Sequence, residues 1–142
     1  MGAAKPPAGW RHRVPAVPVP VLALVAVGCF LATVVLSNGH LHQESSSCRW
    51  LEVPWTHFAV SYAVPVAAGL ALLLHVRLFR TARRRGWNPL AAWDGRLSVA
   101  GAVVAGLLVP LGLVGVWLTH SQAAESAANQ GRPMCEGAAL LR

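Results

Sequence analysis

Charged residues are scarce in this sequence, and three long stretches contain none at all. The 142 residues include five acids and a single lysine, and 12% of them are charged whereas 55% are hydrophobic. That balance excludes an ordinary soluble domain. Because charged residues inside a membrane usually mark ion and proton paths, their absence from the apolar stretches also argues against an ion-coupled transporter.

The motifs of several enzyme classes are missing as well. The sequence has no glycine-rich nucleotide-binding loop, no Ser-His-Asp arrangement that the topology would bring together, and no Cys-x-x-Cys pair. We therefore expect neither a self-contained enzyme nor a thiol-redox catalyst.

The uncharged stretches are the main structural signal. Each has about twenty residues, enough to cross a hydrocarbon core of about 30 Å at about 1.5 Å per residue. They are residues 17–36, 57–76 and 97–118. The sequence thus predicts an all-α integral membrane protein with three transmembrane helices. The first stretch exceeds the apolar core of a cleaved signal peptide, so we expect it to remain as an anchor.

The remaining segments are polar and too short to bury cores of their own. They are an N-terminal tail, 1–16, two loops, 37–56 and 77–96, and a C-terminal tail, 119–142. Ser37-Asn38-Gly39 is typical of a helix end, and Asn88-Pro89 is suited to begin a short interfacial helix. The small polar residues after Thr119 predict a loose tail as far as Cys135.

Basic residues are distributed unequally over these segments. Nine of the twelve lie in residues 1–16 and 77–96, together with one acid, whereas the other two segments hold three basic residues and four acids. Two spans separate the basic segments, so they share a side, which the positive-inside rule assigns to the cytoplasm. We therefore expect a cytoplasmic N-terminus and an extracytoplasmic C-terminus. The arginine- and alanine-rich composition is typical of GC-rich bacterial coding and suggests a bacterial plasma (inner) membrane.

The loop at 77–96 carries most of this positive charge. Setting the membrane topology is by itself a sufficient reason for these arginines to be present. Beside the membrane, each would also attract anionic lipids by about 1 kcal/mol. The formal charge of +7 could indicate a nucleic-acid partner, but we expect none because the basic residues adjoin apolar spans. The predicted lipid-facing cluster is Arg77, Arg80, Arg83, Arg84 and Arg85.

The expected topology places two of the three cysteines in one oxidising compartment. These are Cys48 in the outer loop and Cys135 in the C-terminal tail. We predict a disulfide between them that staples the tail to the loop. Cys29 lies within the first span, where a thiol behaves as a small apolar group.

Four histidines are expected at or beyond the outer membrane boundary. Imidazoles near Cys48, Glu44 and Glu52 could bind zinc or copper, which accept nitrogen, sulfur and oxygen ligands. The alternative is that these histidines are interfacial and hold no ligand. The candidate metal ligands are His40, His42, His57 and His120.

Haem is a further possibility, because paired histidines on neighbouring helices can bind its iron. His57 and His120 would form such a pair at the outer face. His75 could serve a second haem, but the other spans offer no histidine at its depth. We therefore expect no cofactor, with copper, zinc and haem as the alternatives.

The third stretch contains small residues at four-residue spacing. Small faces allow helices to approach closely in lipid, so these residues are predicted to pack within the bundle or against another subunit. They are Gly101, Ala102, Ala105 and Gly106. Pro65 and Pro110 are expected to kink the second and third helices.

These features favour a small, non-catalytic membrane protein. The predicted role is an accessory or assembly subunit of a larger membrane complex, or a homo-oligomer, whose partners are the bilayer and other membrane subunits. An extracytoplasmic metal or redox site is the alternative function. A third possibility is an oligomeric pore or carrier built from kinked helices.

Overall fold

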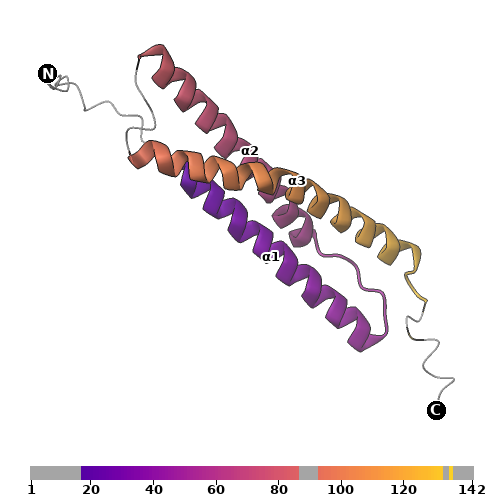
Figure 1. Ribbon diagram of the computed structural model, residues 1–142. Helices are drawn as coiled ribbons and strands as arrows, with labels where there is room; N and C mark the ends of the chain where they lie inside the picture. Colours follow the sequence, from indigo (N-terminus) through magenta and orange to yellow (C-terminus); the bar gives the residue numbers. More distant parts are fainter. Residues whose placement is uncertain (1–16, 87–92, 133–134, 136–142) are drawn as a thin grey trace, which may run out of the picture.

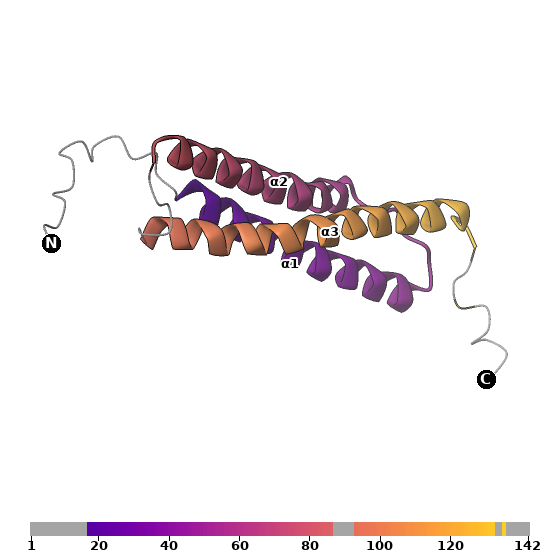
Figure 2. The ribbon, with the colours of Figure 1, turned by 45° about the horizontal axis from the view of Figure 1, so that its top comes forward.

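Three long helices account for most of the computed structural model, which describes residues 17–86, 93–132 and 135. They are α1 (Pro18–Ser47), α2 (Trp55–Arg84) and α3 (Trp93–Ala128). The helices lie side by side as a bundle in both ribbon views (Figure 1, Figure 2). Each is long and apolar enough to cross a membrane. The predicted all-α fold with three membrane-spanning helices is therefore confirmed.

The first helix is longer than the sequence predicted. It continues through Ser37, Asn38 and Gly39, which we expected to end it, and stops at Ser47 before Cys48 in a left-handed conformation. Half of the expected loop at 37–56 is thus helical. Helix-stop residues carry only weak preferences, which tertiary packing overrides. Here the extra turns bury two polar side chains, His40 and Glu44, inside the bundle.

The other helices also extend beyond their predicted spans. The segment after Thr119 is not a loose tail, because α3 continues to Ala128 through an alanine-rich stretch that favours helix. Helix α2 includes the first arginines of the expected loop at 77–96, and their charge suits a helix C-terminus. The tail 1–16 and the helix predicted from Asn88-Pro89 lie outside the described residues.

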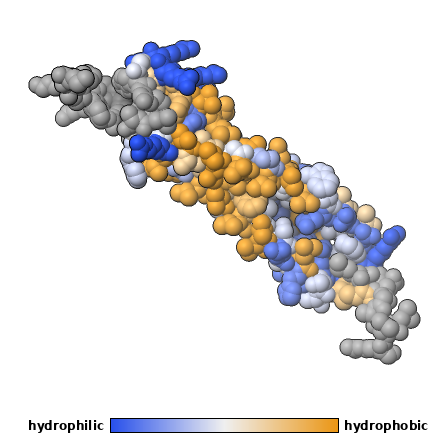
Figure 3. All heavy atoms as spheres, in the orientation of Figure 1, coloured by the Kyte–Doolittle hydropathy of each residue, from blue (hydrophilic) through white to orange (hydrophobic). Residues whose placement is uncertain are grey.

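The bundle has a core of small side chains and carries large apolar side chains on its surface. Alanine and valine dominate the core, which comprises Val19, Ala26, Val64, Ala67, Ala68, Ala71, Ala105 and Leu108. Large residues such as Leu24 and Trp117 are mostly exposed. A broad apolar band separates the hydrophilic ends of the molecule (Figure 3). This distribution suits a three-helix membrane protein, in which close packing rather than burial from water holds helices together.

Two glycines allow α3 to approach its neighbours closely. A Cβ on Gly101 would lie 3.1 Å from the Pro20 Cα of α1, and one on Gly112 would lie 2.9 Å from the Pro65 Cδ of α2. Helices α2 and α3 both run through their internal prolines, Pro65 and Pro110, without interruption. The Pro65 ring of α2 thus occupies the space that a side chain at position 112 would need.

Candidate functional site

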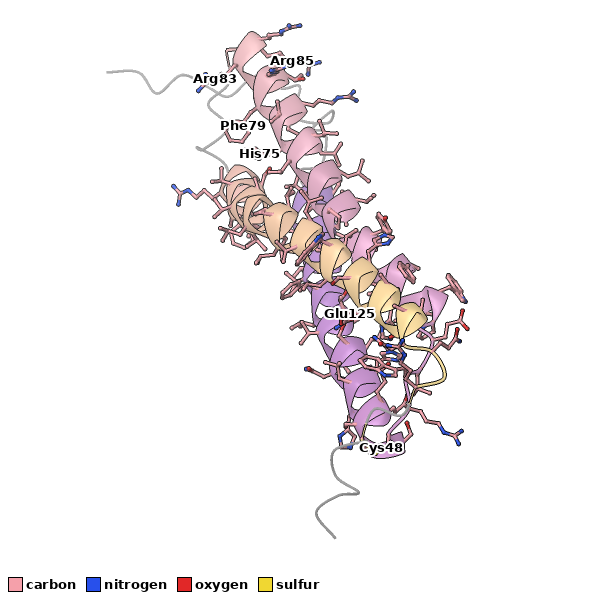
Figure 4. All side chains as sticks on the ribbon, turned by 90° about the vertical axis from the view of Figure 1, so that its right-hand side faces the viewer. Cys48, His75, Phe79, Arg83, Arg85 and Glu125 are labelled. Carbon is pink, nitrogen blue, oxygen red and sulfur yellow. A yellow bond between two sulfur atoms is a disulfide. The ribbon has the colours of Figure 1, made fainter. Side chains whose placement is uncertain are left out.

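A disulfide joins Cys48 to Cys135, as the sequence predicted. The S–S distance is 2.04 Å and the Cα atoms lie 5.3 Å apart. Figure 4 places Cys48 and Glu125 at one end of the bundle and Arg83 and Arg85 at the other. We call these the disulfide end and the arginine end. Which end faces the cytoplasm stays a prediction.

A buried carboxylate connects three parts of the chain at the disulfide end. Glu44 on α1 is 3% exposed. Its Oε1 accepts a hydrogen bond from the Leu51 N–H at 3.0 Å and another from the Ser126 hydroxyl of α3 at 3.3 Å. Hydrogen bonds of this kind offset the cost of removing a carboxylate from water. Glu44 therefore fixes the segment after α1 and the end of α3 against α1.

Two imidazoles lie beside this carboxylate. His40, one turn before Glu44, is 7% exposed, and its Nε2 lies 3.4 Å from Glu44 Oε1. The two atoms are not aligned for a hydrogen bond, and His40 Nε2 has no hydrogen-bond partner. The ring of His57, on α2, meets the His40 ring edge-on at 5.5 Å between centroids. An unsatisfied buried polar atom costs about 1–3 kcal/mol, so His40 Nε2 is an unusual feature.

The other candidate metal ligands lie elsewhere. His120 Nε2 forms a 2.9 Å hydrogen bond with Tyr62 Oη, and its ring contacts Phe58. His42 is exposed. Within the described part of the chain, no three His, Cys, Asp or Glu side chains are arranged to hold a metal ion. The structure brings His40 and His57 together, and the predicted metal and haem sites stay predictions.

Two grooves flank Ser126 at the disulfide end. The larger, of about 350 Å³, is lined by Glu52, Val53, Phe58, Ala123, Ser126, Ala127 and Gln130. The smaller, of about 160 Å³, is lined by His40, Leu41, Glu44, Trp50, Gln122, Glu125 and Ser126. We call them the Glu52 groove and the Glu44 groove. All of the glutamates that the structure describes line these two grooves.

The arginine end has the opposite charge. The predicted lipid-facing cluster, Arg77, Arg80, Arg83, Arg84 and Arg85, is exposed on the last turns of α2 and its C-cap. Beside it, His75 Nδ1 forms a 2.9 Å hydrogen bond with Ser98 Oγ of α3, and the His75 ring packs against the Phe79 ring, tilted by 39° with the centroids 4.4 Å apart. Figure 4 shows His75 and Phe79 next to these arginines. The hydrogen bond between His75 and Ser98 joins α2 to α3 beside an exposed basic surface.

The predicted packing residues of α3 divide into two groups. Gly101, Ala102 and Ala105 are buried inside the bundle. Gly106 is exposed, and a Cβ placed on it would meet nothing within 4 Å. The spacing of small residues therefore does not by itself reveal which of them contact a neighbouring helix.

Sequence reasoning missed the central roles of Glu44 and Ser126. Both were assigned to irregular segments, whereas the structure places both on helices. A usable signal was present, because His40 and Glu44 are four residues apart, as are Gln122 and Ser126. Residues at that spacing share one face of a helix.

The two ends of the bundle thus differ in the ligands that they can attract. Acidic grooves at the disulfide end favour cations, and the exposed arginines at the other end favour anions. No protein-family model matches the chain, and the comparisons with curated proteins and with solved structures find no match either.

Proposed function

We propose that the protein is a non-catalytic accessory or assembly subunit that joins a membrane complex through one face of α3. The position of Gly106 is the observation that supports this proposal. Its small neighbours in the sequence pack internally, whereas Gly106 faces away from the bundle with open space around it. A glycine here is not required by packing within the chain.

The residues around Gly106 form a notched apolar surface. We call it the Gly106 face, and it comprises Val103, Gly106, Leu107, Pro110 and Leu113, all of them exposed. Their spacing of three and four residues puts them on one side of the helix. The larger side chains of this face thus flank Gly106, which has no side chain. In lipid, such small positions allow a second helix to approach its partner's backbone.

The charge at the arginine end supports a fixed orientation for this surface. In the proposed topology the arginine end is cytoplasmic, and its cluster contacts the anionic headgroups of that leaflet. Anchoring of this kind would hold α3 at a defined depth. The Gly106 face would then meet a partner helix at a constant level in the membrane.

Affinity purification of the tagged full-length protein from its native membrane in mild detergent tests the proposal. We expect a membrane protein to co-purify with the wild type, and Gly106→Leu to lower its recovery about tenfold, equivalent to about 1.4 kcal/mol. Gly28→Leu is the matched control, because Gly28 is an exposed glycine of α1 with equally open surroundings.

Two tagged versions of the chain in one cell separate a foreign partner from a second copy. Co-purification of both tags identifies a homo-oligomer, which is the self-associating form of the same role. A monomer without any partner would contradict the proposal, as would equal losses in the two leucine variants.

A further inference from the structure

The Glu44 groove holds negative charge that no arginine of the described chain neutralises. The buried Glu44 and the exposed Glu125 both line it. Neither carboxylate forms an ion pair with an arginine in the residues that the structure describes. Burial of a carboxylate is unfavourable unless opposite charge or hydrogen bonds compensate for it. The hydrogen bonds from Leu51 and Ser126 compensate in part for the burial of Glu44, and a bound cation would add opposite charge to the groove.

The lining of the groove also has an unused hydrogen-bonding atom. His40 is more than nine-tenths buried and lines the groove, and its Nε2 has no hydrogen-bond partner. In one neutral tautomer this atom is an acceptor that lies beside the acceptor Glu44 Oε1, at 3.4 Å. Two neighbouring acceptors fit a ligand that carries several N–H donors.

The size and lining of the groove indicate the class of cation. The described residues provide no set of three metal-ligating side chains, and a volume of about 160 Å³ exceeds the needs of a single ion. Trp50 contributes an aromatic wall, which attracts organic cations, and Gln122 and Ser126 contribute oxygen acceptors. We propose that the Glu44 groove binds a small primary ammonium cation, whose N–H groups donate to the carboxylates and the other acceptors that line the groove.

Such a cation has two plausible sources. The disulfide end lies beyond the apolar band of the molecule (Figure 3). In the proposed membrane arrangement this position is the level of the lipid headgroups. The ligand is therefore either a free amine or the ethanolamine headgroup of a phospholipid. Both present the same charged group to the groove.

Binding of ethanolamine to the full-length protein in detergent tests the ligand class. Ethanolamine hydrochloride should raise the midpoint of thermal unfolding relative to sodium chloride at equal ionic strength. It should bind at least about tenfold more tightly than tetramethylammonium, which has the charge but no N–H donor. Equal affinity for the two ammonium ions, or no binding of ethanolamine, would overturn the proposal.

Two charge-neutral variants test the location. Glu125→Gln should weaken ethanolamine binding about tenfold, because it removes one ionic acceptor and leaves the exposed side chain similar in size. Glu52→Gln removes the same charge from the neighbouring Glu52 groove and should change affinity less than about twofold. An equal effect of the two variants would mean that only the general field of this end attracts the cation, and would refute the site.

Bilayer nanodiscs identify the source. If the headgroup is the ligand, native mass spectrometry should detect a phosphatidylethanolamine retained by the wild type and lost from Glu125→Gln. If a free amine is the ligand, ethanolamine should stabilise the protein in phosphatidylglycerol discs, and phosphatidylethanolamine should not be retained. Absence of both results would count against the proposal.

Discussion

At the scale of single residues, the disulfide end depends on one carboxylate. Glu44 Oε1 receives a backbone N–H and a hydroxyl and lies near an imidazole, so one side chain connects α1, the following segment and α3. Its neighbour Glu125 is an acid at the same end but is exposed. Two glutamates with the same formal charge therefore have different structural importance.

Glu44→Ala should lower the free energy of unfolding by about 1–3 kcal/mol. The substitution leaves the partly buried Leu51 N–H and the buried Ser126 hydroxyl without their acceptor. Glu125→Ala should change stability by less than about 0.5 kcal/mol, since surface substitutions usually do. Denaturant unfolding in detergent, followed by circular dichroism, measures both values. A larger loss for Glu125→Ala than for Glu44→Ala would contradict the assigned role of Glu44.

At the scale of helices, glycines of α3 set how closely it packs against its neighbours. Gly112 lies against Pro65 and Val64 of α2, and a Cβ would come within 2.9 Å of a side-chain atom of each. The proline ring is rigid and cannot move aside without displacing the backbone of α2. A Cβ placed on Gly115, one turn further along, would have nothing within 4 Å.

Gly112→Ala should therefore destabilise the protein by about 1–3 kcal/mol, the usual result of overpacking. Alanine favours helix over glycine by up to about 1 kcal/mol, which is too little to compensate for the contact with Pro65. Gly115→Ala has the same helix preference without the steric conflict and should be neutral or stabilising. Thermal unfolding of the two variants in one detergent distinguishes them, and a neutral Gly112→Ala would show that α2 and α3 separate easily.

Sequence patterns predicted the helices better than their ends. About twenty uncharged residues in a row have one stable arrangement in a membrane, so residues 17–36, 57–76 and 97–118 were recognisable as spans. The polar extensions of α1 and α3 could not be predicted in this way. His40, Glu44 and Ser126 are buried because residues far apart in sequence meet there, and neither hydropathy nor local propensity records such meetings.

The disulfide could also be predicted from the sequence. Once the spans were placed, Cys48 and Cys135 fell on one side of the membrane, and the third cysteine fell within a span. The Glu44 groove could not be predicted, because its walls come from the extensions of two helices, α1 and α3, and from Trp50. Topology thus predicts which residues share a side, whereas packing decides which of them touch.

At the scale of the whole molecule, charge is distributed unequally between the two ends of the bundle. The described glutamates line the grooves at the disulfide end, where Arg49 and Arg132 are also exposed, whereas the cluster of exposed arginines on α2 lies at the other end. This polarity fits a protein that faces different solutions on its two sides. From the positive-inside rule we predict that the arginine end is cytoplasmic.

Labelling in intact cells measures that orientation. In a Cys29→Ser background that keeps the disulfide, Arg132→Cys should react with a membrane-impermeant maleimide, whereas Arg84→Cys should react only after the cells are opened. Both arginines are exposed, so access to the reagent depends on the side of the membrane. The reverse pattern would invert the topology and the proposed lipid contacts of the arginines.

The disulfide also changes how the three helices are connected. Because it joins residues 48 and 135, the chain between them is a covalent ring that contains α2 and α3. A single cut between these helices would open the ring without releasing either fragment, and only reduction would then free them. Helix α1 joins the ring at one point, Cys48. Its opposite end is held by packing, where Pro20 lies against Gly101. Of the described helices, α1 is therefore the one outside the covalent ring, and only non-covalent contacts hold its Pro18 end against α2 and α3.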